Sequence, residues 1–467
     1  MKTIAAISTP AGNGGIGIIR ISGEDALKII DKIFVPVNKS ALKPYTMKLG
    51  NIIDSDGEVV DQVLVSYFKA PKSYTGEDIC EISCHGGNVS IQRILDIVIR
   101  NGALLAEPGE FTKRAFLNGK LDLTQAEAVI DLINSKSEKE GKASVKQLEG
   151  KLGSEIRNIK NEIINMLADI EANIDYPEYE DIEEVRRERI IDVLNKQVIK
   201  LDKLENSFEN GKILKNGVLT AIIGKPNVGK SSLLNILLNE ERAIVTDVPG
   251  TTRDTIEELV NIKGITLRLI DTAGIRETDD VVENIGVEKS KKAISDAELI
   301  LFLIDGSEEI SAEDIELYEL IKAKPHIVII NKIDKINNLG NLNDLFKDDN
   351  NLVDINDLFK DEKNIISISA KNSVGLDELE NKIEELFNIK QLDVENELII
   401  TNIRHKDLIT RAKEGLVRAV SSVTSGIPID MISIDIKTAI DSLGEILGES
   451  ISESVLDRIF EKFCVGK

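Results

Sequence analysis

A glycine-rich segment between an apolar run and an amphipathic stretch is the first candidate for chemistry. It reads Gly224-Lys225-Pro226-Asn227-Val228-Gly229-Lys230-Ser231, which has the spacing of a phosphate-binding loop. Glycines let backbone N–H groups close around phosphates, and the following helix directs its positive end at them. The nucleotide contacts expected here are Asn227, Val228, Gly229, Lys230, Ser231 and Ser232, with Lys230 on the β- and γ-phosphates and Ser231 on Mg²⁺.

Three further motifs each follow an apolar run. They are Asp271-Thr272-Ala273-Gly274, Asn331-Lys332-Ile333-Asp334 and Ser369-Ala370-Lys371. A carboxylate such as Asp334 can accept hydrogen bonds from two N–H donors of guanine, whereas adenine offers no such pair and is rejected. Each motif alone is short enough to occur in a solvated loop. Together, in this order, they predict GTP binding through Asp271, Thr272, Ala273, Gly274, Asn331, Lys332, Asp334, Ser369 and Ala370.

The segment between the first two motifs suggests an unusual hydrolytic mechanism. It reads Thr246-Asp247-Val248-Pro249-Gly250-Thr251-Thr252, and we expect it to contact the nucleotide, with Thr252 completing the Mg²⁺ shell. In Ras-like GTPases a Gln after the D-x-x-G motif orients the attacking water. Ile275 occupies that position here, so another group must orient water and neutralise charge.

With these motifs the chain resembles the bacterial tRNA modification GTPases of the MnmE (TrmE) family, over essentially all 467 residues. The resemblance implies that K⁺ replaces an arginine finger when two G domains meet. Its ligands would be Asn227, Thr246, Val248 and Thr251. It also implies that Glu283 helps to orient the water; from residue type alone, a solvated charge is the simpler interpretation of Glu283.

The C-terminus, Phe463-Cys464-Val465-Gly466-Lys467, matches a second signature of that family. The resemblance implies a functional Cys464 facing a site for a 5-formyltetrahydrofolate-type folate. The folate-binding residues would be Arg20, Glu81, Lys120 and Lys467. Cations suit the glutamyl carboxylates of a folate, and a carboxylate can pair with pterin N–H donors. Without the resemblance, a frayed tail and exposed ion pairs explain the same residues.

The resemblance also implies partners and a reaction. The chain would be a homodimer, would form a heterotetramer with the flavoprotein MnmG, and would use GTP hydrolysis to drive a conformational cycle. The product would be a carboxymethylaminomethyl or aminomethyl group at carbon 5 of the wobble uridine of certain tRNAs. Two alternatives stay open: a regulatory RNA-binding GTPase without modification chemistry, and a folate-dependent transferase with an allosteric G domain.

The amino-acid composition excludes several classes of protein. The net charge is −23, which excludes a uniformly basic nucleic-acid-binding surface but not a local basic patch. Three cysteines cannot form a disulfide framework, no signal peptide is evident, and no run of 18 apolar residues occurs. We therefore expect a cytoplasmic protein that does not enter membranes.

The elements that position these residues follow from hydrophobic periodicity. The predicted fold combines α/β and α parts: an N-terminal α+β folate-binding and dimerisation domain (1–118), a discontinuous helical domain (119–214 and 386–467), and an inserted Ras-like P-loop GTPase domain (215–385). A stripe from Leu148 to Ile174 predicts one long helix that stops near Pro177. A second stripe ends at Asn210-Gly211, where we predict a C-cap.

Several weaker signals have simpler explanations. Gly12 to Gly17 match a dinucleotide-binding fingerprint, which must be followed by a helix. Residues 16–21 instead predict a strand. Cys80, Cys84 and His85 lack a second pair of zinc ligands. The Lys-rich stretch 136–151 and Arg186 to Arg189 carry interleaved Glu, which favours solvated helix faces over tRNA contacts. A tandem near-repeat, 341–348 against 354–361, is interpreted as a duplicated surface loop.

Overall fold

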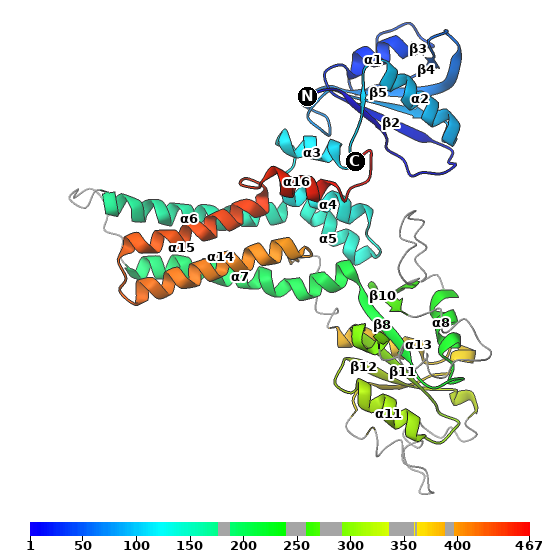
Figure 1. Ribbon diagram of the computed structural model, residues 1–467, viewed down its shortest axis with the longest axis vertical. Coiled ribbons are helices and arrows are strands. Elements are labelled where there is room, and N and C mark those ends of the chain that lie inside the picture. Colours follow the sequence, from blue (N-terminus) through cyan, green and yellow to red (C-terminus); the bar gives the residue numbers. More distant parts are fainter. Residues whose placement is uncertain (176–186, 240–257, 271–291, 336–358, 360–361, 388–396) are drawn as a thin grey trace. The chain divides into compact units, whose positions relative to one another are not determined.

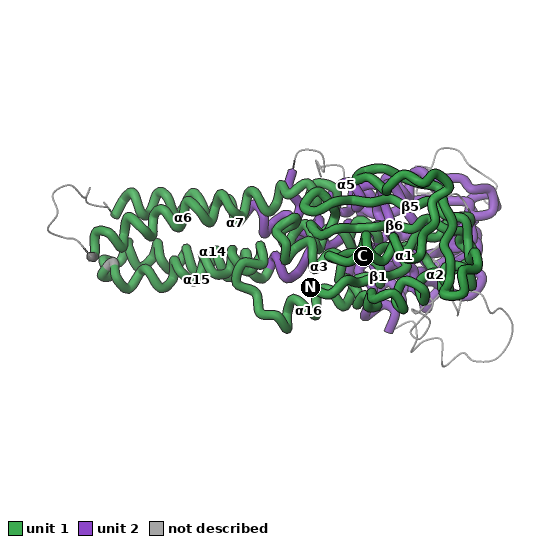
Figure 2. The backbone as a smooth tube through the Cα atoms, turned by 90° about the horizontal axis from the view of Figure 1, so that it is seen from above, with its two compact units in different colours: residues 1–133, 144–202, 407–467 green, residues 134–143, 203–406 purple. Residues whose placement is uncertain are grey.

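The computed structural model describes residues 1–175, 187–239, 258–270, 292–335, 359, 362–387 and 397–467. The chain forms two compact units, shown in Figure 2: residues 1–133, 144–202 and 407–467 make the first, and residues 134–143 and 203–406 make the second. This division is coarser than the four segments expected from the sequence, which stay a prediction. Among the described residues no helix is long and apolar enough to cross a membrane.

The first unit begins with a mixed seven-stranded sheet of order β3-β4-β5-β6-β2-β1-β7. Helices α1 (Ala26–Ile33) and α2 (Asn88–Arg100) cover one face of this sheet (Figure 1). Ile21 and Ile82 of the sheet are fully buried there against Ile94 of α2. A strand follows the glycine-rich segment, as predicted, because alternate residues of 17–22 are apolar and point into the core. The strands are β1 (Ile4–Ile7), β2 (Gly17–Ser22), β3 (Phe34–Pro36), β4 (Met47–Ile53), β5 (Val59–Phe68), β6 (Ile79–Cys84) and β7 (Leu104–Leu105).

The rest of the first unit is helical. The described part of α6 (Lys151–Asp175) reaches to two residues before Pro177, where its end is predicted, but the start of that helix and the C-cap predicted at Asn210-Gly211 need correction. The stripe that starts at Leu148 is broken at Gly150, whose φ of 81° ends one helix before the next begins. The second helix does not stop at Gly211 but runs on to Asn216, and Gly217, with φ 70°, ends it. Gly211 instead allows close packing, because a Cβ there would lie 2.0 Å from the carbonyl oxygen of Ile400.

The helices outside the two sheets pack through buried apolar stripes; along α6, Ile156, Ile159 and Ile163 are fully buried, and α15 lies against it. These helices are α3 (Glu110–Leu117), α4 (Leu123–Ile133), α5 (Glu138–Leu148), α6 (Lys151–Asp175), α7 (Arg187–Asn216), α14 (Ile403–Thr424), α15 (Ile429–Leu447) and α16 (Glu453–Phe460).

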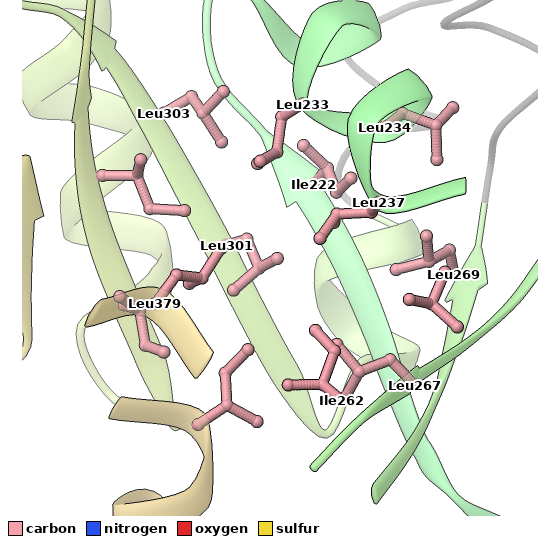
Figure 3. Packing of buried hydrophobic residues seen from close by; sticks show 14 of the residues in the cluster. Ile222, Leu233, Leu234, Leu237, Ile262, Leu267, Leu269, Leu301, Leu303 and Leu379 are labelled. Carbon is pink, nitrogen blue, oxygen red and sulfur yellow. The ribbon is translucent and has the colours of Figure 1, made fainter. Parts of the chain in front are cut away.

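The second unit contains a six-stranded sheet of order β13-β12-β11-β8-β10-β9. All neighbouring strands run parallel except β9 and β10, which form an antiparallel pair. Leucine and isoleucine side chains from β8, β10, β11 and α8 pack into one core (Figure 3). The elements are β8 (Val218–Ile223), α8 (Lys230–Asn239), β9 (Glu258–Ile262), β10 (Ile265–Ile270), β11 (Leu299–Asp305), α11 (Ala312–Ile321), β12 (His326–Asn331), β13 (Ile365–Ser367) and α13 (Leu376–Leu386).

Candidate functional sites

The first candidate site lies at the carboxyl edge of the second unit's parallel sheet. Strand β8 runs into the phosphate-binding loop, β11 ends at Asp305, and β12 ends at Asn331. Asp305 and Asn331 are paired across the two strands. Because the carboxyl ends of parallel strands meet at one edge, motifs far apart in the chain come together there.

The phosphate-binding loop has the local geometry that its sequence predicts. Gly224 and Gly229 adopt φ values of 150° and 102°, and Asn227 adopts 64° with its side chain exposed. The Lys230 ammonium donates to the carbonyl oxygens of Gly224 and Lys225, at 2.5 and 2.7 Å, inside the loop. Burial lowers the pKa of Lys230. Helix α8 begins at Lys230, and Ser231 and Ser232 lie in its first turn. The positive end of the helix and the Lys230 ammonium therefore both lie at the phosphate-binding loop.

Asn331 connects the phosphate-binding loop to the Ser369-Ala370-Lys371 motif. Its side-chain amide donates to the carbonyl oxygen of Val228 at 2.8 Å and accepts from the backbone N–H of Ala370 at 3.0 Å. Asp334 joins the same group, because the Ser369 hydroxyl donates to its carboxylate at 2.6 Å and lowers the pKa of Asp334. The phosphate-binding loop, the Asn331–Asp334 motif and the Ser369–Lys371 motif are therefore joined by hydrogen bonds at one edge of the sheet.

Two ion pairs at this edge were not expected from the sequence. Lys332, with φ 65°, pairs with Asp305 at 2.5 Å. Burial raises the pKa of Asp305, but hydrogen bonds from Lys332 and Ser307 hold it below its ordinary value. Within the phosphate-binding loop, Lys225 pairs with the buried Asp314 of α11 at 2.7 Å. A carboxylate at the end of a buried strand was the signal that could have pointed to Asp305.

Part of the predicted nucleotide site lies outside the described residues. This applies to Thr246, Asp247, Val248, Pro249, Gly250, Thr251, Thr252, Asp271, Thr272, Ala273, Gly274 and Glu283.

The second candidate site lies on the sheet of the first unit, on the face opposite α1 and α2. Arg20 on β2 and Glu81 on β6 are directly paired, and the Arg20 Nε donates to Glu81 at 2.9 Å. The Arg20 guanidinium also lies 5.4 Å from the ring centre of Tyr74 and 5.7 Å from that of Phe111. Two aromatic faces and one carboxylate therefore hold this cation in place.

The C-terminal tail is attached to the same sheet. Val465 forms a bridge with Pro108, the Ser8 hydroxyl donates to the Gly466 carbonyl oxygen at 3.0 Å, and Gly109 N–H donates to the Cys464 carbonyl oxygen at 3.4 Å. The tail is therefore ordered rather than frayed. Its Cys464 thiol is exposed.

Lys467 ends the tail close to the Arg20–Glu81 pair. Burial and the positive charge of Arg20 lower the pKa of Lys467, while Glu81 opposes that shift. Lys120 is exposed and donates to the carbonyl oxygen of Pro71 at 3.2 Å. The fold thus brings Arg20, Glu81 and Lys467 together. Lys120, which lies between α3 and α4, contacts the loop that leads to Tyr74 through Pro71.

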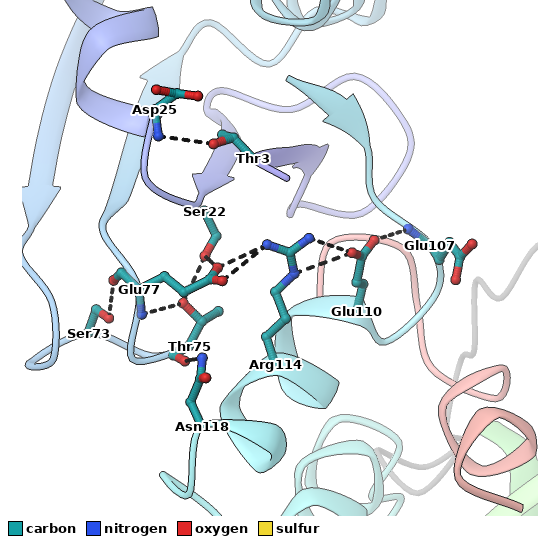
Figure 4. A network of polar contacts seen from close by, with 10 residues as sticks. All are labelled: Thr3, Ser22, Asp25, Ser73, Thr75, Glu77, Glu107, Glu110, Arg114 and Asn118. Carbon is teal, nitrogen blue, oxygen red and sulfur yellow. Dashed lines mark hydrogen bonds and ion pairs between the residues drawn. The ribbon is translucent and has the colours of Figure 1, made fainter. Parts of the chain in front are cut away.

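A partly buried polar network supports the loop that leads to Tyr74 (Figure 4). Arg114 of α3 pairs with Glu77 at 3.0 Å and with Glu110 at 2.7 Å. Glu77 also accepts from the hydroxyl of Ser22, at the end of β2, at 2.8 Å. The network joins β2, the loop and α3, and so fixes Tyr74 next to Arg20. Tyr74, Phe111 and Arg114 were not predicted as site residues, because no local pattern in the sequence signals that they lie near Arg20.

Comparisons with known proteins bear on both sites. The family described as "GTP-binding protein TrmE N-terminus" matches residues 3–120, and "MnmE helical domain" matches residues 123–464. The chain belongs to the MnmE (TrmE) family. The resemblance predicted from the motifs is thereby confirmed, as is the fold class: an N-terminal TrmE-type domain, a helical domain and a P-loop GTPase fold.

Relatives in this family span the whole chain. Proteins named "tRNA modification GTPase MnmE" from Thermoanaerobacter pseudethanolicus and Bacillus licheniformis are 49% and 46% identical to it. Each alignment covers 100% of this chain and 99% and 100% of the relative, respectively. Among solved structures, Era from Aquifex aeolicus bound to GDP and AlF4⁻ is 33% identical over 42% of this chain and 66% of that chain, with a TM-score of 0.28.

Proposed function

We propose that this chain is a GTP hydrolase that acts in tRNA modification, as its relatives are named. The observation that carries the proposal is the Asn331 side chain, which joins the phosphate-binding loop to the Ser369–Ala370 motif. Lys230 would neutralise the phosphates, and Asp334 would accept from guanine. Of the other predicted residues, Lys332 would flank the base.

Two cations would complete the nucleotide site. Ser231 and Thr252 would hold Mg²⁺, since hydroxyl oxygens suit a hard cation. Asn227 fits a K⁺ ion, because its left-handed backbone leaves an exposed side-chain amide oxygen in the phosphate-binding loop. Thr246, Val248 and Thr251 would supply the remaining K⁺ ligands. When bound, K⁺ supplies positive charge at the transferring phosphoryl group; Glu283 would orient water.

For the first unit we propose a site for a formyltetrahydrofolate-type folate. Arg20, Lys120 and Lys467 would bind its carboxylates, and Glu81 would accept from pterin N–H groups. Cys464 would face this site from the ordered tail. A supporting observation is that the charge of Arg20 lowers the pKa of Lys467, so two cations converge where an anion would relieve their repulsion.

The proposed assembly is a homodimer that joins the flavoprotein MnmG in a heterotetramer in the cytoplasm and modifies carbon 5 of the wobble uridine. Exposed apolar side chains on the outer face of the first unit's sheet support dimerisation; they are Val35, Leu49 and Leu64, which are 48%, 46% and 39% exposed. An uncovered apolar sheet face of this kind is typical of an interface.

The experiment that tests the function is nucleoside mass spectrometry on tRNA from a strain that lacks this protein. Loss of the carbon-5-modified wobble uridines, restored by the intact chain but not by Lys230→Ala or Cys464→Ser, is the expected result. Unchanged nucleosides would instead favour a regulatory GTPase.

A salt comparison tests the K⁺ role separately. We expect Mg²⁺-dependent GTP turnover to be much faster in K⁺ than in Na⁺, and Asn227→Ala to remove the difference. Equal rates in the two salts would contradict the role given to Asn227.

A further inference from the structure

Two segments of the first unit are basic although the whole chain is acidic. Residues 37–48 contain three lysines and residues 66–72 contain two, and neither segment contains an acidic residue. The net charge of the whole chain is −23, whereas the net charge of each of these two segments is positive. A local positive patch on an acidic protein indicates a surface for a polyanion.

The fold places these two segments side by side. The Tyr45 N–H donates to the carbonyl oxygen of Tyr67 at 2.7 Å, and the Tyr45 hydroxyl donates to that of Lys69 at 3.0 Å. Strands β4 and β5 continue this pairing from Met47 and Ser66 onward. The lysines of both segments therefore belong to one surface at the end of the sheet.

The ammonium groups of this surface are available. Lys39, Lys43, Lys69 and Lys72 are exposed, and no described carboxylate lies within ion-pair distance of them. The two acids that follow this loop along the chain are already engaged. Glu77 pairs with Arg114 at 3.0 Å, and Asp78 accepts from the Tyr67 hydroxyl at 3.1 Å and from Ala70 N–H at 2.8 Å. We call these four lysines and Tyr45 the lysine surface.

Tyr45 gives the lysine surface a second property. Tyr45 is an aromatic residue that is 54% exposed. Its ring makes an edge-to-face contact with Phe68, with 6.5 Å between the ring centres. Its backbone is held in a left-handed conformation, with φ 59°. An exposed, oriented aromatic ring among unpaired lysines is the combination that binds single-stranded nucleic acid: bases stack on the ring while the lysines neutralise phosphates.

We propose that the lysine surface binds a single-stranded stretch of RNA and leads it toward the Arg20–Glu81 pair. The loop from Lys69 passes Pro71, which accepts from Lys120, and reaches Tyr74, whose ring flanks Arg20. An unstacked loop of a tRNA fits both the charge and the ring. This inference rests on tRNA as the substrate proposed above, but not on the folate.

The test measures binding of a tRNA and of its isolated anticodon stem-loop to the full-length protein over a range of salt concentrations. The triple variant Lys43→Ala/Lys69→Ala/Lys72→Ala should bind roughly tenfold more weakly at about 0.1 M salt, with a salt slope smaller by about 2 to 3. A matched control, Lys196→Ala/Lys200→Ala/Lys203→Ala, removes three exposed lysines of α7 and should change affinity less than about twofold.

A second pair of variants isolates the ring. Tyr45→Ala should weaken binding roughly five- to tenfold, with an unchanged salt slope, whereas Tyr45→Phe should retain most of the affinity. GTP turnover of every variant should match that of the unaltered protein, which shows that the chain is folded.

Two results would overturn the proposal. One is a tRNA affinity that is unchanged in the triple variant or equally reduced in the α7 control. The other is a triple variant that loses affinity only for pentaglutamyl 5-formyltetrahydrofolate, since that would assign the lysines to a folate tail. If the unaltered protein binds tRNA through the lysine surface but binds no folate, the folate proposal fails and this one stands.

Discussion

The two candidate sites are built in opposite ways. In the second unit, the contacts that join Val228, Asn331 and Ala370 lie at the ends of neighbouring parallel strands, and short contiguous motifs supply them. In the first unit, Arg20 and Lys467 come from opposite ends of the chain, and single residues from β2, β6, a loop and the tail contribute one group each. The first arrangement depends on backbone geometry, the second on long-range packing.

This difference predicts which changes each site tolerates. A site made of loop backbone and strand ends should lose function when its charge or its connecting hydrogen bonds are removed. A site assembled by packing should be sensitive to backbone shape far from the functional groups, as at Gly466.

The largest effect is expected for Lys230→Ala. Removing the ammonium that lies inside the phosphate-binding loop should lower the rate constant of GTP hydrolysis roughly 100-fold or more. Folate binding, measured by calorimetry on the same variant, should be unchanged because the two sites share no residue. A parallel loss of folate affinity would contradict the separation of the sites.

Asn331→Ala should loosen the hydrogen-bonded edge of the second unit. The side chain is 2% exposed and uses both its donor and its acceptor, so the change leaves two buried backbone groups unpaired, at a cost of about 2 to 4 kcal/mol. Native-state hydrogen exchange should show faster opening of β8 and β12. Asn372→Ala, at an exposed position nearby, is the control and should leave exchange as it is.

Gly466→Ala should disturb the packed site without removing any charge. Gly466 has a φ of 94°, and a Cβ there would lie 2.3 Å from the carbonyl oxygen of Ile7. A left-handed conformation costs a non-glycine residue about 1 to 2 kcal/mol, so folate affinity should fall roughly tenfold. Val465→Ala, at a 49% exposed neighbour, should bind folate normally. GTP turnover should stay constant in both variants.

The smallest expected effect is a pH dependence that belongs to Lys467. Because its pKa is lowered by burial and by Arg20, its ammonium loses its proton at a lower pH than an ordinary lysine. Anion binding is fully supported below the lowered pKa and weakens as the pH rises through it. Folate affinity should therefore fall a few-fold between about pH 7 and 10.

Lys467→Arg is the matched control for that pH dependence. Arginine stays charged throughout this range, so the variant should bind folate with little change between the two pH limits. A fall in affinity that is the same in Lys467→Arg would assign the titration to another group.

The helix limits show how far periodicity alone can be taken. The apolar stripe from Leu148 onward is real, but the left-handed turn at Gly150 divides it between α5 and α6. Gly211 looked like a cap because glycine often ends helices. Its actual role, close contact with the backbone of Ile400, involves a residue 189 positions away in the sequence and leaves no local signature.

The sequence by itself determined the phosphate-binding loop, the order of the nucleotide motifs and the family, because each depends on contiguous residues whose spacing sets backbone geometry. It also suggested Arg20, Glu81 and Lys467, but only through resemblance. The tertiary structure decided that these three meet, that Tyr74 and Phe111 flank Arg20, and that the tail is ordered against β1 and α3. Such contacts arise when separate elements bury their apolar faces together, and no short segment specifies which distant partner it will meet.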